Sequence, residues 1–564
     1  MKRIFSAVGA TTPRCVGIRT GKYLGVFGLW ALALSTVAFS QGAAPAVSCE
    51  SLAKLSLPNT TITLAETVAA GQFKVPTQAG GGPGGPGGPG GPDAAGGPGG
   101  AANRPPGGGG GNPFSPTPDL KSLPAFCRVA ATLKPTSDSD IRVEVWLPIN
   151  GWNGNYVGVG SGGWAGHIIY SGTPLGLVDA LRMGYAAANT DAGHQGNGGE
   201  FIPGHPEKLI DYGYRANHEM TLKAKAIIAA FYGVRPKYSI FAGCSLGSTQ
   251  ALTEANRFPE DYDGVVAGAA MTPISVFNAV QMWPGWLVYK DPSKFIPREK
   301  YTMIHEAALK ACAGPVGLKQ GFIEEPDRCR FDPESLLCKG ADAPDCLTAP
   351  QVELMRQIYE GPIDPKTNKS IFPGPAIGGE LQLPGYASPN GPFSAALQLY
   401  KYAVHQDANW DWKTADFFGD IALGRKILDP VLNVNSNFKP FFDRGGKLMI
   451  YIGWTDYHNP MQTIEYYRAV LKDSGGSKVA DSIRLFNIPG MDHCVGGAGC
   501  DSFDKVTPMA QWIESGKAPD QLLATKVVNG KVIRTSPLCA YPKVATYKGT
   551  GDMDDAANFV CAKP

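Results

Sequence analysis

Residues 243–247 read Gly-Cys-Ser-Leu-Gly and stand between an apolar run at 238–242 and a helix-like stretch at 248–255. A strand, a sharp turn and a helix form the context in which a G-x-S-x-G motif exposes its serine above the edge of a sheet. The glycines permit the tight turn, and the first N–H groups of the helix point at charge that develops there. In a chain with 72 glycines the motif arises easily by chance. Its meaning therefore depends on partners elsewhere in the chain.

The length and charge of the chain set broad limits on fold and partners. A chain of 564 residues exceeds what a single core normally fills, which predicts two domains or one large domain with a major insertion. The composition is globular, with 43% apolar and 18% charged residues. A net charge of +2 indicates no global attraction to nucleic acid or to anionic membranes. We expect neither as a partner.

The N-terminus resembles an export signal. It combines a basic start with an apolar stretch at 24–39 and a small-x-small cleavage site at 38–40, and no acidic residue precedes Glu50. The basic residues are Lys2, Arg3, Arg14, Arg19 and Lys22. We predict a signal peptide over 1–40; the alternative is an uncleaved anchor, since the apolar stretch is slightly long. No later apolar stretch reaches bilayer length, so we expect a soluble, secreted or periplasmic mature protein with no membrane contact after cleavage.

The cysteines fit an exported protein. Twelve are present, and in that setting they predict disulfide bonds rather than a metal cluster. Cys15 lies in the signal region, so eleven remain and at least one stays unpaired. The chain has no C-x-x-C pair, which argues against zinc ribbons and thioredoxin-like redox chemistry.

A Gly- and Pro-rich segment lies between Cys49 and Cys127. From Gly80 it repeats Gly-Gly-Pro, and the same composition continues to Pro118. Such a segment buries little apolar surface, so we predict a disordered loop over 79–118. A collagen-like triple helix is disfavoured, because the repeat is short and its register breaks after Pro92.

The rest of the chain alternates strand-like and helix-like patterns, which predicts a mostly parallel sheet covered by helices. The expected strands cover 141–147, 156–159, a short stretch near Tyr185, 238–242, 447–452 and 483–488, and the expected helices cover 220–231, 248–255 and 461–473. Between 271 and 436 the character changes to helix-like stretches, Pro/Gly turns, four cysteines and clustered aromatic residues. We therefore expect core segments at 41–270 and 437–564 and an inserted lid at 271–436, whose aromatic rings either stack on a substrate or form lid core.

The glycine-rich stretch at 160–166 follows an early strand. A loop of this kind allows the backbone to approach a substrate closely and suits a second oxyanion donor. A nucleotide phosphate loop is the alternative, but the stretch lacks the Lys-Ser/Thr of a P-loop. We expect the oxyanion donors to be the N–H of Leu246 and that of a glycine between Gly160 and Gly163.

A nucleophilic serine needs a base and a carboxylate that orients the base, in the chain order Ser, Asp/Glu, His for an α/β-hydrolase. Ser245, Asp456 and His493 meet this order, and each follows a strand-like run. The other histidines after the serine are less suitable: His305 and His405 lie in the expected lid, and His458 shares a loop with Asp456. Asp492 is the alternative acid, and the pair Asp191 and His194 precedes the serine and is interpreted as structural.

A cysteine adjoins both the nucleophile and the base: Cys244 precedes Ser245, and Cys494 follows His493. A bridge between these cysteines would tie the two reacting groups together. The alternative, two unrelated thiols, is less expected in an exported protein.

Taken together, these motifs resemble the tannase and feruloyl esterase family, to which monohydroxyethyl terephthalate hydrolase is related. The resemblance covers essentially the whole mature chain. It rests on Gly-Cys-Ser-x-Gly, on Asp-His-Cys at 492–494, and on Trp-Asn-Gly at 152–154 before a glycine-rich loop, with support from the stretches 124–127, 261–267 and 442–447. It implies an α/β-hydrolase core with a large lid that hydrolyses esters of aromatic acids through an acyl-enzyme.

The resemblance also assigns residues. It implies Ser245, Asp456 and His493 as the triad and Gly162 and Leu246 as the oxyanion donors. It further implies five disulfide bonds that leave Cys500 over: Cys244–Cys494, Cys49–Cys127, Cys312–Cys329, Cys338–Cys346 and Cys539–Cys561.

Two positions depart from the family pattern. The family's lid usually carries a calcium loop with several carboxylates, but here Ala313, Val316 and Gln320 stand at those places and Lys319 is adjacent. Calcium needs several hard oxygen ligands, so we predict that this site holds no calcium. Ser248 replaces the glycine usual after the motif, a change that leaves the turn itself intact.

From the sequence we therefore expect an exported serine esterase that acts on small-molecule aromatic esters, such as gallate or ferulate esters, without metal or organic cofactor. The alternatives are a non-catalytic binding or surface protein that retains the fold, a peptidase, and a terephthalate monoester hydrolase. The last is least favoured, because no lid arginine is placed against a substrate carboxylate. The oligomeric state is not readable from the sequence.

Overall fold

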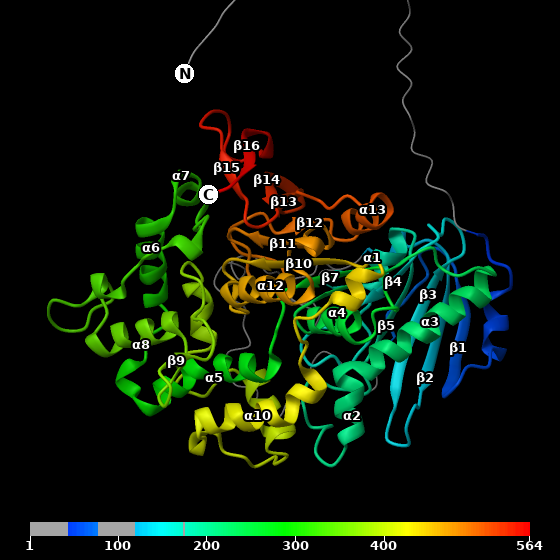
Figure 1. Cartoon of the computed structure of the whole chain (residues 1–564), viewed down its shortest axis with the longest axis horizontal. Helices are drawn as coiled ribbons and strands as arrows, with labels where there is room; N and C mark the ends of the chain where they lie inside the picture. The colour runs from blue at the N-terminus through cyan, green and yellow to red at the C-terminus, as the bar shows by residue number, and fades with distance from the viewer. Residues whose placement is uncertain (1–42, 77–118, 173–174) are drawn as a thin grey trace, which may run out of the picture. The chain divides into compact units, whose positions relative to one another are not determined.

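The computed structural model describes residues 43–76, 119–172 and 175–564 (Figure 1). Within them, nine strands form one sheet in the order β1-β2-β3-β5-β4-β6-β7-β10-β11. The strands are β1 (Thr60–Val68), β2 (Phe126–Leu133), β3 (Ile141–Pro148), β4 (Tyr156–Val159), β5 (Ala186–Thr190), β6 (Ser239–Cys244), β7 (Gly264–Gly268), β10 (Lys447–Gly453) and β11 (Ile483–Ile488). The predicted signal peptide over 1–40 and the predicted disordered loop over 79–118 lie outside the described residues.

Parallel pairing dominates the part of the sheet that carries the site. The strands β5, β4, β6, β7, β10 and β11 pair in parallel, whereas β1, β2 and β3 are joined to one another and to β5 antiparallel. The register sets Cys244 opposite Gly268, Gly268 opposite Tyr451, and Gly453 opposite Ile488. The carboxyl ends of β6, β10 and β11 therefore meet at one edge, where open α/β sheets bind their ligands. The predicted mostly parallel sheet is confirmed.

Helices cover both faces of this sheet. On one face, α3 (Ala216–Tyr232), α4 (Leu246–Arg257) and α12 (Pro460–Ser474) bury apolar side chains against residues such as Val265 and Ile450. On the other face, α1 (Leu177–Arg182) and α13 (Thr507–Ser515) pack against Val266 and Met449. Successive strand residues thus enter opposite cores, as the period of a strand requires. A short helix, α2 (Pro206–Ile210), precedes α3.

A large insert separates β7 from β10 and spans residues 269–446. It contains a small hairpin, seven α-helices and several shorter 3-10 and π-helical turns within the described residues, and an apolar cluster of its own that includes Tyr301, Leu354 and Met355. Its elements are α5 (Ile274–Lys290), α6 (Lys300–Cys312), α7 (Pro315–Gln320), α8 (Ala349–Glu360), β8 (Ile363–Asp364), β9 (Lys369–Ser370), α9 (Ser394–Gln398), α10 (Phe417–Leu432) and α11 (Lys439–Asp443). The predicted insertion between core strands is confirmed.

The chain ends in a separate set of strands that the sequence patterns did not predict. A three-stranded antiparallel sheet holds β12 (Ser502–Phe503), β13 (Gln521–Val528) and β14 (Lys531–Cys539). A hairpin of β15 (Val544–Tyr547) and β16 (Phe559–Ala562) follows, and Cys539–Cys561 joins it to β14.

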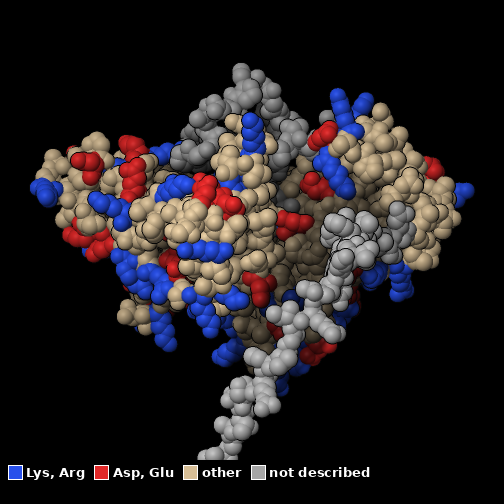
Figure 2. Space-filling view, turned by 90° about the horizontal axis from the view of Figure 1, so that it is seen from above, with Lys and Arg blue, Asp and Glu red and all other residues tan. Residues whose placement is uncertain are grey.

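Two further observations concern partners. On the face shown in Figure 2, basic and acidic side chains are interspersed rather than gathered into a field of one sign. Among the helices of the described residues, none combines the length and the apolar character that a membrane span needs.

Candidate active site

Ser245 sits in a strained turn at the end of β6. Its backbone angles are φ 62° and ψ −125°, a region that non-glycine residues rarely adopt and that costs about 1–3 kcal/mol. A backbone hydrogen bond stabilises the turn: the N–H of Ser245 donates to the Gly268 carbonyl, at the end of the neighbouring strand β7, at 2.9 Å. Glycine is required beside it: a Cβ on Gly243 would lie 2.2 Å from the Gly247 carbonyl oxygen. The strand, the turn and α4 therefore match the context that the motif predicted.

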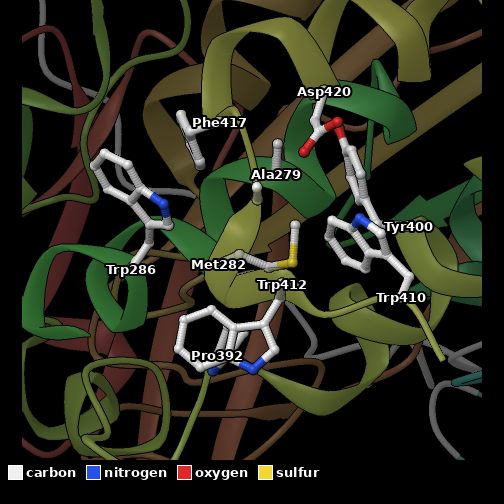
Figure 3. Close-up of a pocket in the computed structure, with 10 residues that line it drawn as sticks. Ala279, Met282, Trp286, Pro392, Tyr400, Trp410, Trp412, Phe417 and Asp420 are labelled. Carbon is white, nitrogen blue, oxygen red and sulfur yellow. The ribbon is translucent and has the colours of Figure 1, made fainter. Parts of the chain in front are cut away.

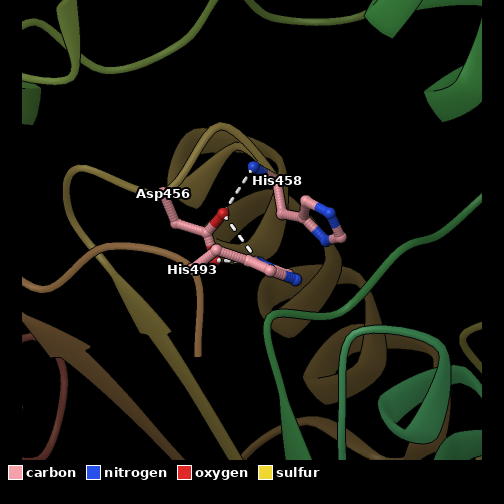
Figure 4. A group of neighbouring side chains, drawn as sticks. All are labelled: Asp456, His458 and His493. Carbon is pink, nitrogen blue, oxygen red and sulfur yellow. Dashed lines mark hydrogen bonds and ion pairs between the residues drawn. The ribbon is translucent and has the colours of Figure 1, made fainter. Parts of the chain in front are cut away.

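Asp456 and His493 meet at the adjoining strand ends (Figure 4). His493 Nδ1 lies 3.1 Å from both carboxylate oxygens of Asp456. The carboxylate is fully buried, whereas the imidazole side chain is 39% exposed. A buried carboxylate on Nδ1 fixes the tautomer of the ring and leaves Nε2 as the atom that exchanges a proton.

The two groups shift each other's titration. Burial disfavours the charged form of His493, but the neighbouring Asp456 carboxylate outweighs it, and the pKa of His493 is raised above its ordinary value. Burial likewise opposes ionisation of Asp456, but the electrostatic interactions with His493 and His458 and the hydrogen bonds from both outweigh it, and the pKa of Asp456 is lowered. The pair thus favours an ionised carboxylate beside a basic imidazole.

The disulfide bond Cys244–Cys494 joins the residue before Ser245 to the residue after His493. His493 Nε2 lies 3.7 Å from Cys494 Sγ, so the exchanging nitrogen lies beside this bridge. Among the described residues, the Ser245 hydroxyl makes no hydrogen bond, to His493 or to any other group. In ligand-free sites such bonds are often long and tighten only with substrate.

His458 is a neighbour of the site that sequence reasoning set aside. Its ring lies 3.9 Å from the His493 ring, centroid to centroid. The backbone N–H of His458 donates to Asp456 Oδ1 at 2.8 Å. Burial and the nearby His493 lower its pKa to about 3, so it is neutral in the physiological range. The sequence signal was its place two residues after Asp456, because an aspartate side chain often accepts an N–H two residues on.

The glycine-rich loop at 160–166, in which we expect an oxyanion donor, packs against the turn at Ser245. The Gly160 N–H donates to the Ala242 carbonyl at 2.9 Å, and a Cβ on Gly160 would lie 2.8 Å from Gly247 Cα. A Cβ on Gly162 would meet nothing within 4 Å. Neither the Gly162 N–H nor the Leu246 N–H donates to a protein group within the described residues.

Other candidate residues lie elsewhere. Asp492 accepts a hydrogen bond from Thr455 Oγ1 at 2.8 Å rather than from His493. Asp191 accepts the N–H groups of Arg142 and Gly193, and the His194 ring stacks on Phe201. Inside the insert, His305 pairs with Glu380 and His405 with Asp420.

The five disulfide bonds of the structure join the pairs that the family resemblance implies, which confirms that the chain carries disulfide bonds. Besides Cys244–Cys494 they are Cys49–Cys127, Cys312–Cys329, Cys338–Cys346 and Cys539–Cys561. Cys500 is buried and, within the described residues, has no disulfide partner.

The stretch that corresponds to the family's calcium loop does not fit calcium. The N–H groups of Gly314 and Gly317 donate to both oxygens of the Glu324 carboxylate, at 2.9 and 2.7 Å. Lys319 and Gln320 bind the Asp554 carboxylate, at 2.9 and 3.0 Å. The local carboxylates are thus taken up by amides and a cation, and a hard cation lacks its ligands.

Two other groups contain metal-ligating side chains. Asp456, His458 and His493 present atoms within 4.8 Å of one another, as do His218, Glu254 and Asp261. The first group is accounted for by the hydrogen bonds above. In the second, His218 Nδ1 lies 2.6 Å from Asp261 Oδ2, and burial together with the Asp261 charge raises the pKa of Glu254 well above its usual range.

A pocket opens beside the histidines. The Phe277 ring lies 4.7 Å from that of His458, and Phe277 lines this pocket with residues from the insert and from the Asp456 loop. The lining comprises Phe277, Val280, Gln281, Phe372, Pro375, Tyr457 and Asn459, and it carries no charge. Asn459 also ties the insert to the Asp456 loop, since its amide nitrogen donates to the Gly374 carbonyl at 3.2 Å.

A second pocket lies across α5 from the first. Helical periodicity puts Phe277, Val280 and Gln281 on one face of α5 and Ala279, Met282 and Trp286 on the opposite face. The second pocket is lined by the rings of Trp286, Tyr400, Trp410, Trp412 and Phe417, with Asp420 at one edge beside Tyr400 (Figure 3). The first pocket is therefore the one of the two that adjoins the histidines, because its lining residue Phe277 contacts the His458 ring.

Comparison with known proteins identifies relatives. The family model for tannase and feruloyl esterase matches residues 127–562. An uncharacterized esterase of Xanthomonas campestris is 34% identical over 572 aligned residues, 92% of each chain, and feruloyl esterase B of Aspergillus niger is 30% identical over 460, which covers 77% of this chain and 86% of that protein.

Solved structures agree. Feruloyl esterase B from Aspergillus oryzae matches with a TM-score of 0.78 and 26% identity, over 91% of this chain and 99% of that chain. Tannin acyl hydrolase from Aspergillus niger matches with a TM-score of 0.67 over 91% of this chain and 93% of that chain. At 18% identity, the latter similarity concerns the fold alone.

Proposed function

Because the chain belongs to the tannase and feruloyl esterase family and is a carboxylic ester hydrolase, we propose that it hydrolyses esters of phenolic carboxylic acids through an acyl-enzyme on Ser245. The observation that carries this proposal is the buried Asp456 carboxylate on His493 Nδ1, with a disulfide that ties the histidine loop to the Ser245 turn. The core has the α/β-hydrolase fold of its relatives.

The proposed chemistry follows from this geometry. His493 Nε2 accepts the Ser245 proton as Oγ attacks the ester carbonyl, and the imidazolium then protonates the leaving alkoxide. The N–H groups of Gly162 and Leu246 stabilise the oxyanion, and the N-terminal end of α4 adds a favourable dipole. A water molecule, deprotonated by His493, then attacks the acyl-enzyme, and the imidazolium returns this proton to Ser245 Oγ as the bond to the acyl group breaks and the acid leaves. Asp456 stays ionised throughout and stabilises the imidazolium.

The uncharged pocket beside His458 supports a neutral phenolic ring as the acyl group, such as that of gallate or ferulate. A terephthalate monoester places a second carboxylate in the pocket, and an apolar lining without a basic residue disfavours its desolvation. We further propose that residues 271–436 act as a lid over the site. The name of one relative, feruloyl esterase B of Aspergillus niger, agrees with this substrate class.

Export remains part of the proposal. The basic and apolar N-terminus and the five disulfide bonds favour an oxidising compartment, outside the cell or in the periplasm.

The substrate assignment is tested by the purified protein on matched methyl esters of gallic, ferulic and terephthalic acid. We expect kcat/KM to be highest for a phenolic ester and lowest for the terephthalate monoester. A preference for the terephthalate monoester would contradict the substrate proposal.

Gln281 is expected to contribute to ring specificity. It is 3% exposed and supplies an amide to a mostly apolar pocket lining. Because we expect the amide to bind a ring hydroxyl, Gln281→Leu should lower kcat/KM for methyl ferulate about tenfold relative to methyl 3-methoxycinnamate, which lacks only that hydroxyl. Steady-state kinetics on the two esters measure the ratio. An equal loss on both esters would show that the amide does not read the hydroxyl.

The Cys244–Cys494 bridge is expected to affect activity more than stability. In the double variant Cys244→Ala with Cys494→Ala, the loops of Ser245 and His493 are no longer tied, and we expect kcat to fall about 10- to 100-fold at temperatures where the protein stays folded. Circular dichroism locates that range. The matched control removes Cys338–Cys346 in the insert and is expected to retain kcat. An unchanged rate in the first variant would refute this role.

A further inference from the structure

The proposed oxyanion donors belong to one packed unit. The Gly160 backbone lies against α4 so closely that a Cβ there would be 2.8 Å from Gly247 Cα and 2.9 Å from Gly243 Cα. One donor, the N–H of Leu246, belongs to the first residue of α4. The other, on Gly162, is in the loop that packs on this turn. Catalysis therefore depends on how the loop is held against the helix.

A single side chain of α4 reaches the loop through a hydrogen bond. Gln250 Oε1 accepts the Ser161 N–H at 2.8 Å, and the two residues are 2% and 3% exposed. Gln250 stands four residues after Leu246, on the same side of the helix. Leu246, which carries one donor, and Gln250, which holds the loop that carries the other, therefore lie on one face of α4.

The next peptide of the loop is oriented by the same contact surface. A Cβ on Gly247 would lie 2.7 Å from the Ser161 carbonyl oxygen, so this oxygen faces α4. In a trans peptide the carbonyl and the following N–H point in opposite directions. The Gly162 N–H therefore points away from Gly247, and a Cβ on Gly162 would meet nothing within 4 Å.

The Gln250 amide is used on one side only. Its Nε2 has no hydrogen-bond partner within the described residues. A buried donor without a partner costs stability, because its lost hydration is not replaced. The oxygen that binds the loop is therefore the feature that this position supplies.

We propose that Gln250 is a positioning residue for the oxyanion hole: its amide oxygen holds the Ser161 N–H and thereby fixes the Gly162 N–H relative to that of Leu246. This inference rests on the proposed function of Ser245. Gln250 itself touches no reacting atom. Loss of the Gln250 acceptor lets the loop shift away from α4. Transition-state binding then weakens, while substrate binding in the pocket beside His458 is kept.

The experiment compares Gln250→Met, which keeps the length but removes the acceptor, with Gln250→Glu, which keeps an acceptor oxygen. We expect Gln250→Met to lower kcat on methyl ferulate about 10- to 100-fold with KM changed less than about twofold, as expected for a displaced oxyanion donor. Gln250→Glu is expected to recover most of the rate. The matched control is Gln351→Met, which removes another buried glutamine that bonds the Phe295 carbonyl inside the insert.

A second readout separates positioning from general destabilisation. A phenylboronic acid forms a tetrahedral adduct on Ser245 that places an oxygen in the oxyanion hole, whereas ferulic acid binds as a ground-state product. In Gln250→Met the inhibition constant of the boronic acid should rise by the same factor as kcat falls, and that of ferulic acid should stay unchanged. If Gln250→Met does not fold, Gln250→Asn, which is one methylene shorter, takes its place.

The outcomes are distinct. A kcat within about twofold of the wild type, an equal loss in Gln351→Met, or an unchanged boronic acid affinity would overturn the role of Gln250. Ser245→Ala serves as the reference for the proposed function: turnover retained in that variant would refute the catalytic serine itself. Inactive Ser245→Ala together with unaffected Gln250→Met would refute only the inference about Gln250.

Discussion

Replacement of Ser245 by alanine is expected to lower kcat on aryl esters by about 10⁵-fold or more, because the acyl-enzyme has no other nucleophile from which to form. The fold should persist. Alanine removes only the hydroxyl, which makes no hydrogen bond among the described residues, and the backbone bond from residue 245 to the Gly268 carbonyl remains. Initial rates on a p-nitrophenyl ester and a thermal melt by circular dichroism measure the two quantities.

Ser239→Ala provides the matched control, since Ser239 is a buried serine at the opposite end of the same strand, β6. We expect this variant to retain kcat. If Ser245→Ala retained a rate enhancement over the uncatalysed reaction close to that of the wild type, Ser245 would not be the nucleophile.

Replacement of Asp456 by asparagine is expected to lower kcat by about 10⁴-fold, because an amide on Nδ1 favours the wrong tautomer of His493 and leaves the imidazolium unpaired. The pH profile should change as well. In the wild type the charge of Asp456 raises the pKa of His493, and the active form is the neutral ring, so activity is lost as pH falls through this raised pKa. Without the carboxylate the raised pKa falls, and the acid limb of the remaining activity moves to lower pH.

Asp492→Asn is the matched control for this prediction. Asp492 adjoins His493 in the chain, but its carboxylate accepts from Thr455 Oγ1 at 2.8 Å. We expect the control to change kcat little and to move the acid limb less than Asp456→Asn does, because the Asp492 charge is the smallest of the contributions that raise the pKa of His493. If instead Asp492→Asn lost as much activity as Asp456→Asn, the acid of the triad would be misassigned.

Much of the core was predictable because its strands are short apolar runs, several of which end in loops that carry candidate catalytic residues. The expected strands at 156–159 and 483–488 match β4 and β11, and the run at 447–452 extends by a single residue, to Gly453, in β10. The expected helices at 220–231 and 461–473 lie within α3 and α12. Buried parallel strands give strong local signals, and the chain order of serine, acid and histidine then places three loops at one sheet edge.

The position of His458 illustrates what sequence order misses. A residue two positions after Asp456 was expected to lie too close to face it across the site. The ring does not need to face Asp456, because the turn carries it back over His493, while its N–H binds the carboxylate. Whether a loop folds back in this way depends on tertiary packing, here against Phe277 of the insert.

The C-terminal strands and the role of Gln250 escaped prediction for related reasons. The strand β13 alternates buried and exposed residues only in its first half, and β14 is exposed over its first three residues, so neither gives a clean period of two. Gln250 lies in a helix pattern, where a polar residue is ordinarily solvent-facing. Its partner Ser161 is 89 residues away along the chain, and only the packing of α4 on the glycine-rich loop brings them together.

The most direct test of the account is to trap the acyl-enzyme. The wild-type protein is mixed with a p-nitrophenyl ester of ferulic acid, quenched in acid within the first turnovers, digested, and analysed by tandem mass spectrometry. The account predicts a feruloyl adduct on the peptide that contains Ser245, located on the serine and absent from His493→Ala. An adduct located on a different residue, or rapid turnover by a protein whose Ser245 stays unmodified during the burst, would contradict it.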